Sequence, residues 1–210
     1  MPEPVIKSLK DGPFIVSNLK NIFEQDGKRL NSEGAVSLCR CGETRNKPFC
    51  DNSHSGAGFR SGKLPGRKKD RAVSYPGEGV TVVDNRGVCS HDGSCFRSLP
   101  EVFRPKEWRW IKPGGVSAER IIDTVRKCPS GALSYSIGGV RYQNLERPPA
   151  LCIDERGPLN AEGRIRLIDC DGSTPESEEH YSLCSCGRSK NKPFCDGSHA
   201  PGVFKYEDRE

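Results

Sequence analysis

A cysteine-rich segment occurs twice in this chain, and this repeat constrains the possible folds more than any other feature of the sequence. The segment from Cys39 to His54 returns 145 residues later as the segment from Cys184 to His199. Across residues 12–59 and 157–204, twenty of 48 aligned pairs are identical and no gap is needed. The chain therefore contains two copies of a small module, one towards each end.

Modules of this size bury too little apolar surface to be stable without a metal or a partner. Hydrophobic residues make up only 33% of the chain, which also contains 23 glycines and 16 prolines, so we expect a small, loop-rich α+β protein. The cysteine count of 11 is odd and excludes complete disulfide pairing within one chain. The cysteines are therefore candidates for metal binding.

The beginning of the sequence favours a reducing compartment. Residues 1–7 contain no apolar segment of the kind found in secretory signals, and no stretch approaches the roughly 18 apolar residues of a membrane span. We expect a cytoplasmic protein with no membrane span, in which cysteines bind metal rather than cross-link. The basic run at 63–71 contains no aromatic residue, so we interpret it as a solvated linker and expect no nucleic-acid partner.

Each terminal motif offers four potential metal ligands. Both copies have the spacing Cys-x-Cys-x8-Cys-x3-His. Three thiolates and one imidazole suit a closed zinc site. They also suit an iron–sulfur cluster with two cysteines on one iron and a cysteine and a histidine on the other. Zinc sites usually separate their first two cysteines by two to four residues, but the spacing alone leaves both metals open.

The run Cys195-Asp-Gly-Ser-His199 resembles the signature of the CDGSH (mitoNEET-like) iron–sulfur family. The resemblance extends back to Gly157-Pro158 and covers about half of the chain in its two copies. It implies two [2Fe–2S] clusters, each held by three cysteines and one histidine. The ligands implied are Cys39, Cys41, Cys50 and His54 in the first copy and Cys184, Cys186, Cys195 and His199 in the second.

The first copy departs from the family signature once, because Asn52 stands where the second copy has Gly197. Asparagine tolerates a positive φ better than most residues, so we expect the turn to be kept. Asp51 and Asp196 follow the third cysteine of each motif, where we expect a carboxylate to cap the start of a short helix.

Thr44 and Ser189 are expected to donate hydrogen bonds to a cluster sulfur and so tune its reduction potential. The simpler alternative is a metal that only supports folding and transfers no electrons. We favour a redox cluster. A metal that only stabilised the fold would be held equally well by a fourth cysteine, which would leave the histidine unexplained.

The segment between the modules resembles the single-cluster bacterial ferredoxins. It contains Cys89 and Cys95, followed much later by Cys128-Pro. Asp92 stands where the four-cysteine version of the pattern has its middle cysteine. The resemblance implies either a [3Fe–4S] cluster on three cysteines or a [4Fe–4S] cluster with Asp92 on the fourth iron. His91 is the less favoured candidate for that fourth position.

Hydrophobic patterning predicts alternating strands and helices in this middle segment. We expect strands at 80–83, 107–111 and 131–137, a helix over 96–103, and a second helix from the N-cap Ser117 to about Lys127. Trp108 and Trp110 are expected to fill the small core. Two cysteines remain outside the three ligand sets, and we expect both Cys152 and Cys170 to be buried structural thiols.

These observations predict three domains, with CDGSH modules at 1–71 and 146–210 and a ferredoxin-like α+β domain inserted at 72–145. We expect each module to combine a β-rich cap, cluster-binding loops and a short helix. The two modules should pair across an intramolecular pseudo-two-fold within a monomer, as two chains do in the family's homodimers.

Three functions are compatible with this organisation. The first is single-electron transfer to a redox partner, and the second is storage of clusters or their delivery to an apo-protein acceptor. The third is a zinc-stapled interaction protein. The sequence contains no nucleophile–base pair, phosphate loop or cofactor fingerprint, so we do not expect an enzyme.

Overall fold

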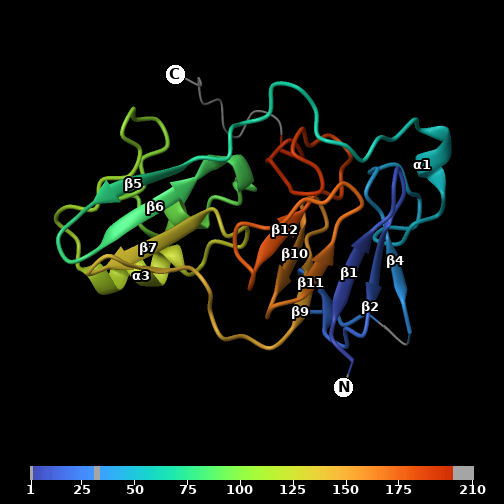
Figure 1. Cartoon of the computed structure of the whole chain (residues 1–210), viewed down its shortest axis with the longest axis horizontal. Helices are drawn as coiled ribbons and strands as arrows, with labels where there is room; N and C mark the ends of the chain where they lie inside the picture. The colour runs from blue at the N-terminus through green and yellow to red at the C-terminus, as the bar shows by residue number, and fades with distance from the viewer. Residues whose placement is uncertain (1, 31–33, 201–210) are drawn as a thin grey trace.

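The computed structural model describes residues 2–30 and 34–200, and its described strands form three four-stranded sheets. Figure 1 shows the sheet of the middle segment on one side, the strands of the second module in the centre and those of the first module on the other side. The chain is a small α+β protein of short strands with few helices, as its composition predicts.

The first sheet contains three strands from the first module. They are β1 (Val5–Ser8), β2 (Phe14–Ser17) and β4 (Val36–Leu38), and their order in the sheet is β1-β2-β4. The fourth strand is β11 (Arg166–Ile168), which belongs to the second module and pairs in parallel with β1. The first module therefore completes its sheet with a strand from the far end of the chain.

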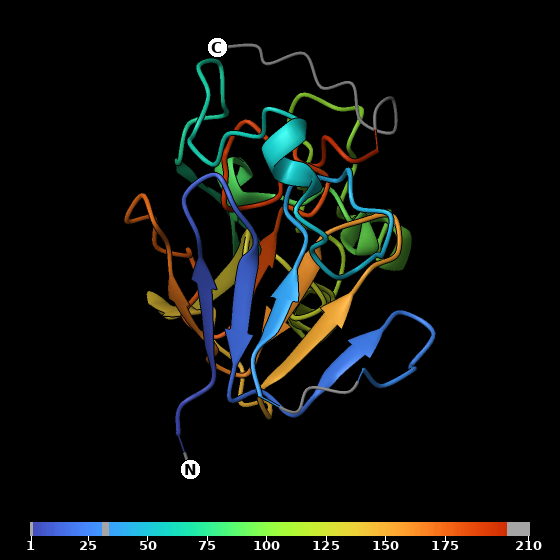
Figure 2. The same cartoon turned by 90° about the vertical axis from the view of Figure 1, so that its right-hand side faces the viewer.

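The second sheet repeats this arrangement with the modules exchanged. It contains β9 (Ala150–Ile153), β10 (Leu159–Glu162) and β12 (Tyr181–Leu183) of the second module. Its remaining strand is β3 (Ile22–Glu24) of the first module, which pairs in parallel with β9. Each module thus gives one strand to the other, and the strands of both run side by side in Figure 2.

Both modules share one hydrophobic core. Ile6, Phe14 and Leu38 of the first module pack in the same cluster as Leu159 and its neighbours in the second. Buried and less buried residues alternate along most of these strands, as expected where one face of a sheet is packed and the other faces solvent. Separating the modules would expose this shared core.

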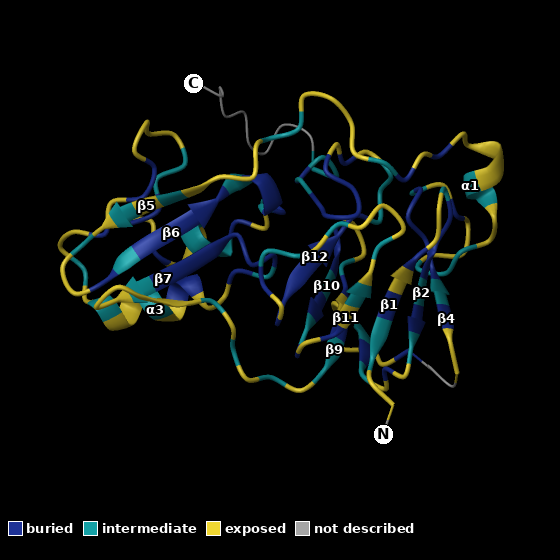
Figure 3. Cartoon of the chain, in the orientation of Figure 1, coloured by how far each residue is buried: buried dark blue, intermediate teal, exposed yellow. Residues whose placement is uncertain are grey.

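The middle domain has its own sheet and its own core. Its antiparallel strands, in their order in the sheet, are β5 (Ala72–Pro76), β6 (Thr81–Asn85), β7 (Leu133–Ile137) and β8 (Val140–Tyr142). Its helical segments are the 3-10 turn η1 (Arg86–Val88) and the helices α2 (Ser94–Ser98) and α3 (Ala118–Val125). Figure 3 shows that β6 and β7 form its most deeply buried part.

The predicted strands at 80–83 and 131–137 are confirmed as β6 and β7, and the predicted second helix is α3 with Ser117 as its N-cap. The predicted first helix is shorter and lies at 94–98. The predicted strand at 107–111 is wrong. Its only bridge among the described residues joins Ile111 to Phe103, and the rest is a loop.

The same loop corrects the expectation for Trp108. Its side chain is 73% exposed, because the loop carries it away from the core. Trp110 is buried as expected and donates a hydrogen bond from Nε1 to Oδ2 of Asp84 at 3.2 Å. No helix among the described residues is long and apolar enough to cross a membrane.

Candidate metal centres

The four predicted ligands of the first module lie in two close pairs. Cys39 and Cys41 follow β4, and their Sγ atoms are 3.6 Å apart. Cys50 and His54 lie on the next loop and on α1 (Ser53–Gly56), and 3.4 Å separates the Cys50 Sγ from the His54 Nδ1. The x8 spacing allows the loop to return both pairs to one end of the sheet.

The second module has the same two pairs. The Sγ atoms of Cys184 and Cys186 are 3.8 Å apart, and the Cys195 Sγ lies 3.3 Å from the His199 Nδ1. Among the described residues, no three His, Cys, Asp or Glu side chains converge closely enough to hold one metal ion. Each module therefore offers a Cys–Cys pair and a Cys–His pair, four candidate ligands of the types that zinc and iron–sulfur clusters both accept.

Aspartate carboxylates shape the turn between the third cysteine and the histidine. Oδ1 of Asp51 accepts the N–H of Ser53 at 3.1 Å, and Oδ1 of Asp196 accepts that of Ser198 at the same distance. Their second oxygens accept the backbone N–H of Arg45 at 2.9 Å and of Lys190 at 2.8 Å. Each carboxylate thus joins two segments of its cluster loop.

The predicted tolerance of asparagine in this turn is confirmed, since Asn52 has φ 69° and Gly197 has φ 82°. The predicted short helix forms in the first copy as α1, directly after Asn52. It is wrong for the second copy, where the described residues up to Ala200 form only a turn. Asp196 therefore caps a turn and not a helix.

Two hydroxyl groups hydrogen-bond within the loops that carry the candidate ligands. Thr44 donates to the carbonyl oxygen of Phe49, and Ser189 donates to that of Phe194, both at 2.7 Å. In this arrangement the two side chains close the loop, and their hydrogen bonds to a cluster sulfur stay a prediction. The N–H groups that contact ligand sulfur include that of Gly42, 3.4 Å from the Sγ of Cys39.

The environment of three candidate ligand thiols raises their pKa and so favours the protonated form. Burial raises the pKa of Cys41 to about 11 and also raises that of Cys195. Cys184 and Cys186 share a hydrogen bond that raises the pKa of Cys184 and lowers that of Cys186, which Arg188 lowers further. Because thiolates are the metal-binding form, loading the site must release protons.

The two motifs meet where their first ligand loops cross. Cys41 and Cys186 form an antiparallel bridge. A Cβ on Gly42 would lie 2.6 Å from the carbonyl oxygen of Cys186, and a Cβ on Gly187 would overlap that of Cys41. Beside the crossing lies a cleft of about 1140 Å³, lined by ligands of both modules and by acidic side chains that include Glu43 and Asp154. Glycine at positions 42 and 187 is what allows the two ligand loops to approach each other this closely.

In the middle domain, Cys89 follows η1, Cys95 lies in α2 and Cys128 comes shortly after α3. Burial, followed by the nearby Cys89 and Cys128, raises the pKa of Cys95 to about 12. The three predicted ligands are therefore neighbours in space. The charge of Cys89 also contributes to the raised pKa of Cys195, after burial as the largest cause, so the middle site lies close to the second module.

Asp92 does not join the three thiols through any contact that the structure shows. It is exposed, and its Oδ1 accepts the N–H of Ser94 at 2.9 Å while its Oδ2 faces Arg97 at 3.6 Å. Gly93 follows it with φ 84°. This Asp-Gly-Ser turn has the same hydrogen bond as the turn at Asp196.

Sequence reasoning missed Arg86. Its Nη1 donates to the Sγ of Cys89 at 3.5 Å, and its Nε lies 3.3 Å from Asp84. Its guanidinium lies 3.8 Å from the ring centroid of Trp110. Burial, partly offset by Arg86, raises the pKa of Asp84 to about 6. In the sequence, the one sign that Arg86 contacts this site is its position three residues before Cys89.

The expectation for the two remaining cysteines is wrong. All eleven cysteines lie in the described part of the chain as free thiols, and both Cys152 and Cys170 are exposed. In β9, Leu151 and Ile153 take the core-facing positions, so Cys152 between them faces outward. Cys170 lies in the turn after β11, where its N–H donates to the Oγ of Ser8 at 2.8 Å.

Comparison with known proteins agrees with this arrangement. A family model described as an iron-binding zinc finger of CDGSH type matches residues 11–55 and 156–200. A model described as a divergent 4Fe-4S mono-cluster matches residues 75–137. No solved structure matches the chain.

Two curated relatives match the chain over different lengths. The uncharacterized protein YjdI of Escherichia coli (strain K12) is 38% identical over 61 residues, which is 29% of this chain and 80% of that protein. The mitochondrial CDGSH iron-sulfur domain-containing protein 3 of Mus musculus is 79% identical over 19 residues, 9% of this chain and 14% of that protein. This chain therefore belongs to the CDGSH iron–sulfur family, with two CDGSH domains flanking a divergent 4Fe-4S domain.

Proposed function

We propose that this chain is a one-electron carrier with two [2Fe–2S] clusters in its CDGSH modules and one [3Fe–4S] or [4Fe–4S] cluster in its middle domain. The observation that carries the proposal is the pairing of ligands in both modules. Each module offers a Cys–Cys pair and a Cys–His pair, with separations of 3.3–3.8 Å. Such pairs suit two irons, and iron–sulfur clusters supply reversible one-electron chemistry when bound.

The residues assigned to the clusters divide into three sets. The first set is Cys39, Cys41, Cys50 and His54, and the second is Cys184, Cys186, Cys195 and His199. The middle set is Cys89, Cys95 and Cys128, with Asp92 as the candidate for a fourth position. The contacts of Asp92 with Ser94 and Arg97 favour the three-cysteine, [3Fe–4S] form, because its carboxylate is already engaged.

We also propose that the two modules are related by a pseudo-two-fold within one chain, which makes a monomer equivalent to a two-chain assembly. The reciprocal exchange of β3 and β11 supports this relation, since each strand pairs in parallel with the first strand of the other module. The bridge between Cys41 and Cys186 lies at equivalent positions in the two copies. The monomer thereby holds two CDGSH sites with no second chain.

Storage of clusters, or their delivery to an apo-protein, is a second candidate function. The first motif supports it, because Cys50 and His54 are only half-buried and α1 buries none of its residues. An acceptor would have direct access to this pair. The second motif is more covered, which favours retention of its cluster, so we rank electron transfer first. We expect no catalytic turnover of a substrate.

The deciding experiment is anaerobic purification followed by iron, sulfide and zinc analysis and EPR spectroscopy. We expect a red-brown protein with about seven or eight irons per chain, which dithionite reduces and a mild oxidant reoxidises without loss of iron. Rapid cluster loss to an apo-ferredoxin, at a rate above that to a chelator, would favour delivery. Stoichiometric zinc without acid-labile sulfide would overturn both functions and favour a zinc-stapled interaction protein.

A further inference from the structure

The two CDGSH motifs differ in what covers them. Asn191 and Lys192 of the second motif are buried, whereas the equivalent Asn46 and Lys47 of the first are exposed. Figure 1 shows the second module between the middle domain and the first module. The middle domain therefore packs on one motif and leaves the other open.

One close approach at this interface joins His91 to Gly197. A Cβ on Gly197 would overlap the Nδ1 of the His91 ring, so the imidazole lies directly on the Gly197 backbone. His91 is two residues from Cys89, and Gly197 is two residues from Cys195. Only one residue, Ser90 on one side and Asp196 on the other, thus lies between a candidate ligand and this contact.

Two further contacts hold this arrangement in place. The Nδ2 of Asn191 donates to the carbonyl oxygen of Gly87 at 2.7 Å, and the bond is buried. A Cβ on Gly131, three residues after Cys128, would lie 2.8 Å from the Cβ of Ser177. Segments next to two of the three middle-domain cysteines therefore press against the second module.

We propose that the His91–Gly197 contact is the route by which the middle domain and the second CDGSH module exchange electrons, leaving the first module to serve the external partner. This inference rests on the proposed function. With clusters bound, one electron would leave the iron held by one ligand set, which is oxidised, and arrive at the iron held by the other, which is reduced, and no atom or proton would move. His91 is a positioning residue here, because it fixes how closely the two sets approach.

The structure supplies a reciprocal pair of variants for the test. Gly197→Asn gives the second motif the residue of the first, and Asn52→Gly does the reverse. Both residues tolerate the positive φ that these positions have, so backbone strain is similar. Only Gly197→Asn places a side chain against His91, since a Cβ on Gly197 meets that ring and Asn52 is exposed.

The readouts are EPR of the dithionite-reduced chain, where spin coupling between the middle and second sites broadens the signals, and stopped-flow absorbance, which follows electron redistribution. We expect Gly197→Asn to remove the broadening and slow redistribution several-fold, with wild-type iron and sulfide content. Asn52→Gly should match the wild type in both measurements. Thermal unfolding of each variant reports whether folding is affected.

A second variant keeps the test informative if Gly197→Asn does not fold. His91→Asn removes the ring and suits the φ of 57° at that position. It should also weaken the coupling. Wild-type coupling in His91→Asn, or its absence from the wild type, would overturn the inference while leaving the proposed function intact. A wild type that dithionite does not reduce reversibly would instead overturn the proposed function.

Discussion

At the residue scale, the histidine proposed as a ligand is the part of each motif expected to affect the chemistry most. His54 and His199 each pair with one cysteine, and each follows the aspartate turn at the outer end of its motif. A neutral imidazole brings no charge to the iron, whereas a thiolate brings one negative charge. A histidine-ligated iron is therefore easier to reduce than an iron with thiolates alone.

Replacing both histidines by cysteine should consequently lower the reduction potential of the two terminal sites. Thiolate is also a softer ligand than imidazole and suits a cluster iron better, so His54→Cys with His199→Cys should slow cluster loss. Potentiometry and absorbance decay across a pH series measure the two effects. Unchanged potentials and decay rates would show that neither histidine is a ligand.

Asp92 supplies the second prediction at this scale. Carboxylate is a poorer ligand than thiolate for a soft cluster iron, so Asp92→Cys should convert the middle site to a stable [4Fe–4S] form. EPR and Mössbauer spectra of the variant and the wild type distinguish the cluster types. An oxygen-stable [4Fe–4S] signal in the wild type that survives in Asp92→Ala would contradict the [3Fe–4S] form and also show that Asp92 is not the fourth ligand.

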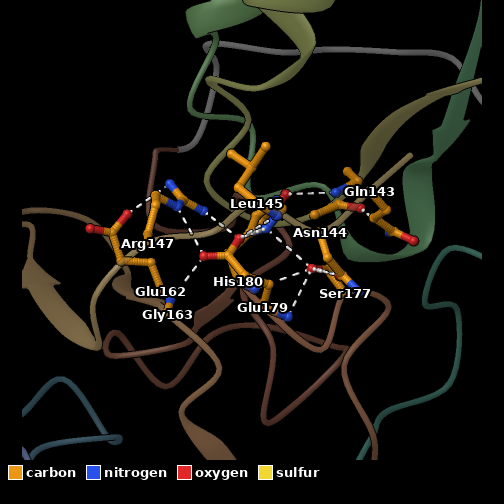
Figure 4. Close-up of polar contacts among 12 residues, drawn as sticks. Gln143, Asn144, Leu145, Arg147, Glu162, Gly163, Ser177, Glu179 and His180 are labelled. Atoms are coloured by element: carbon orange, nitrogen blue, oxygen red, sulfur yellow. Dashed lines mark hydrogen bonds and ion pairs between the residues drawn. The ribbon is translucent and has the colours of Figure 1, made fainter.

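At the element scale, one carboxylate ties the segment after β8 to the second module. Glu179 is fully buried and accepts from the Nε and Nη2 of Arg147 at 2.9 and 2.7 Å and from the N–H of Gly163 at 2.9 Å (Figure 4). The Nδ1 of His180 lies 2.8 Å from the same group. Burial alone would raise the pKa of Glu179, but Arg147 and Gly163 lower it to about 2.

Glu179→Gln should therefore destabilise the chain by about 2 kcal/mol at neutral pH, the scale of a charged hydrogen bond. Because folding lowers this pKa, the contribution is present above the ordinary glutamate value and is lost as the pH falls from about 4.5 towards 2. Urea unfolding at several pH values measures it. Glu178→Gln is the matched control, since the Glu178 side chain is 82% exposed; equal losses in both variants would contradict the argument.

The elements also show what the sequence can and cannot predict. The repeat predicts the ligand pairs, because identical spacing closes identical loops around them. It does not reveal that β1 pairs with β11, since that register joins residues about 160 positions apart. The strand expected at 107–111 fails because Trp108 is exposed on a loop. The sequence also does not reveal that the hydroxyl of Thr44 donates to the carbonyl oxygen of Phe49.

At the scale of the whole molecule, the exchanged strands make each module incomplete alone. A fragment of residues 1–71 contains β1, β2 and β4 but lacks β11, which pairs with β1 in the intact chain. A second copy can supply β3 in the place of β11, because the two strands occupy equivalent positions in the repeat. We therefore expect this fragment to form a dimer.

Sedimentation equilibrium and iron analysis of the fragment test this expectation. A two-chain species with bound iron is the predicted result, and its absorbance should fall on dilution as the dimer dissociates. A folded monomer that retains iron at low concentration would show that the fragment folds without β11 and without β3 from a second copy. The full chain, which carries both strands, serves as the control and should show no such concentration dependence.

Because both modules lie on one chain, the residues of their two sites can vary independently. In a symmetric homodimer, every substitution occurs at both sites together, so neither site can change without the other. Here Asn52 and Gly197 are separate positions, and the chain already differs at them. Glycine occurs where His91 must approach, and asparagine occurs where the motif faces solvent. One polypeptide can therefore keep one module suited to packing against its own middle domain and the other module suited to contact with an external partner.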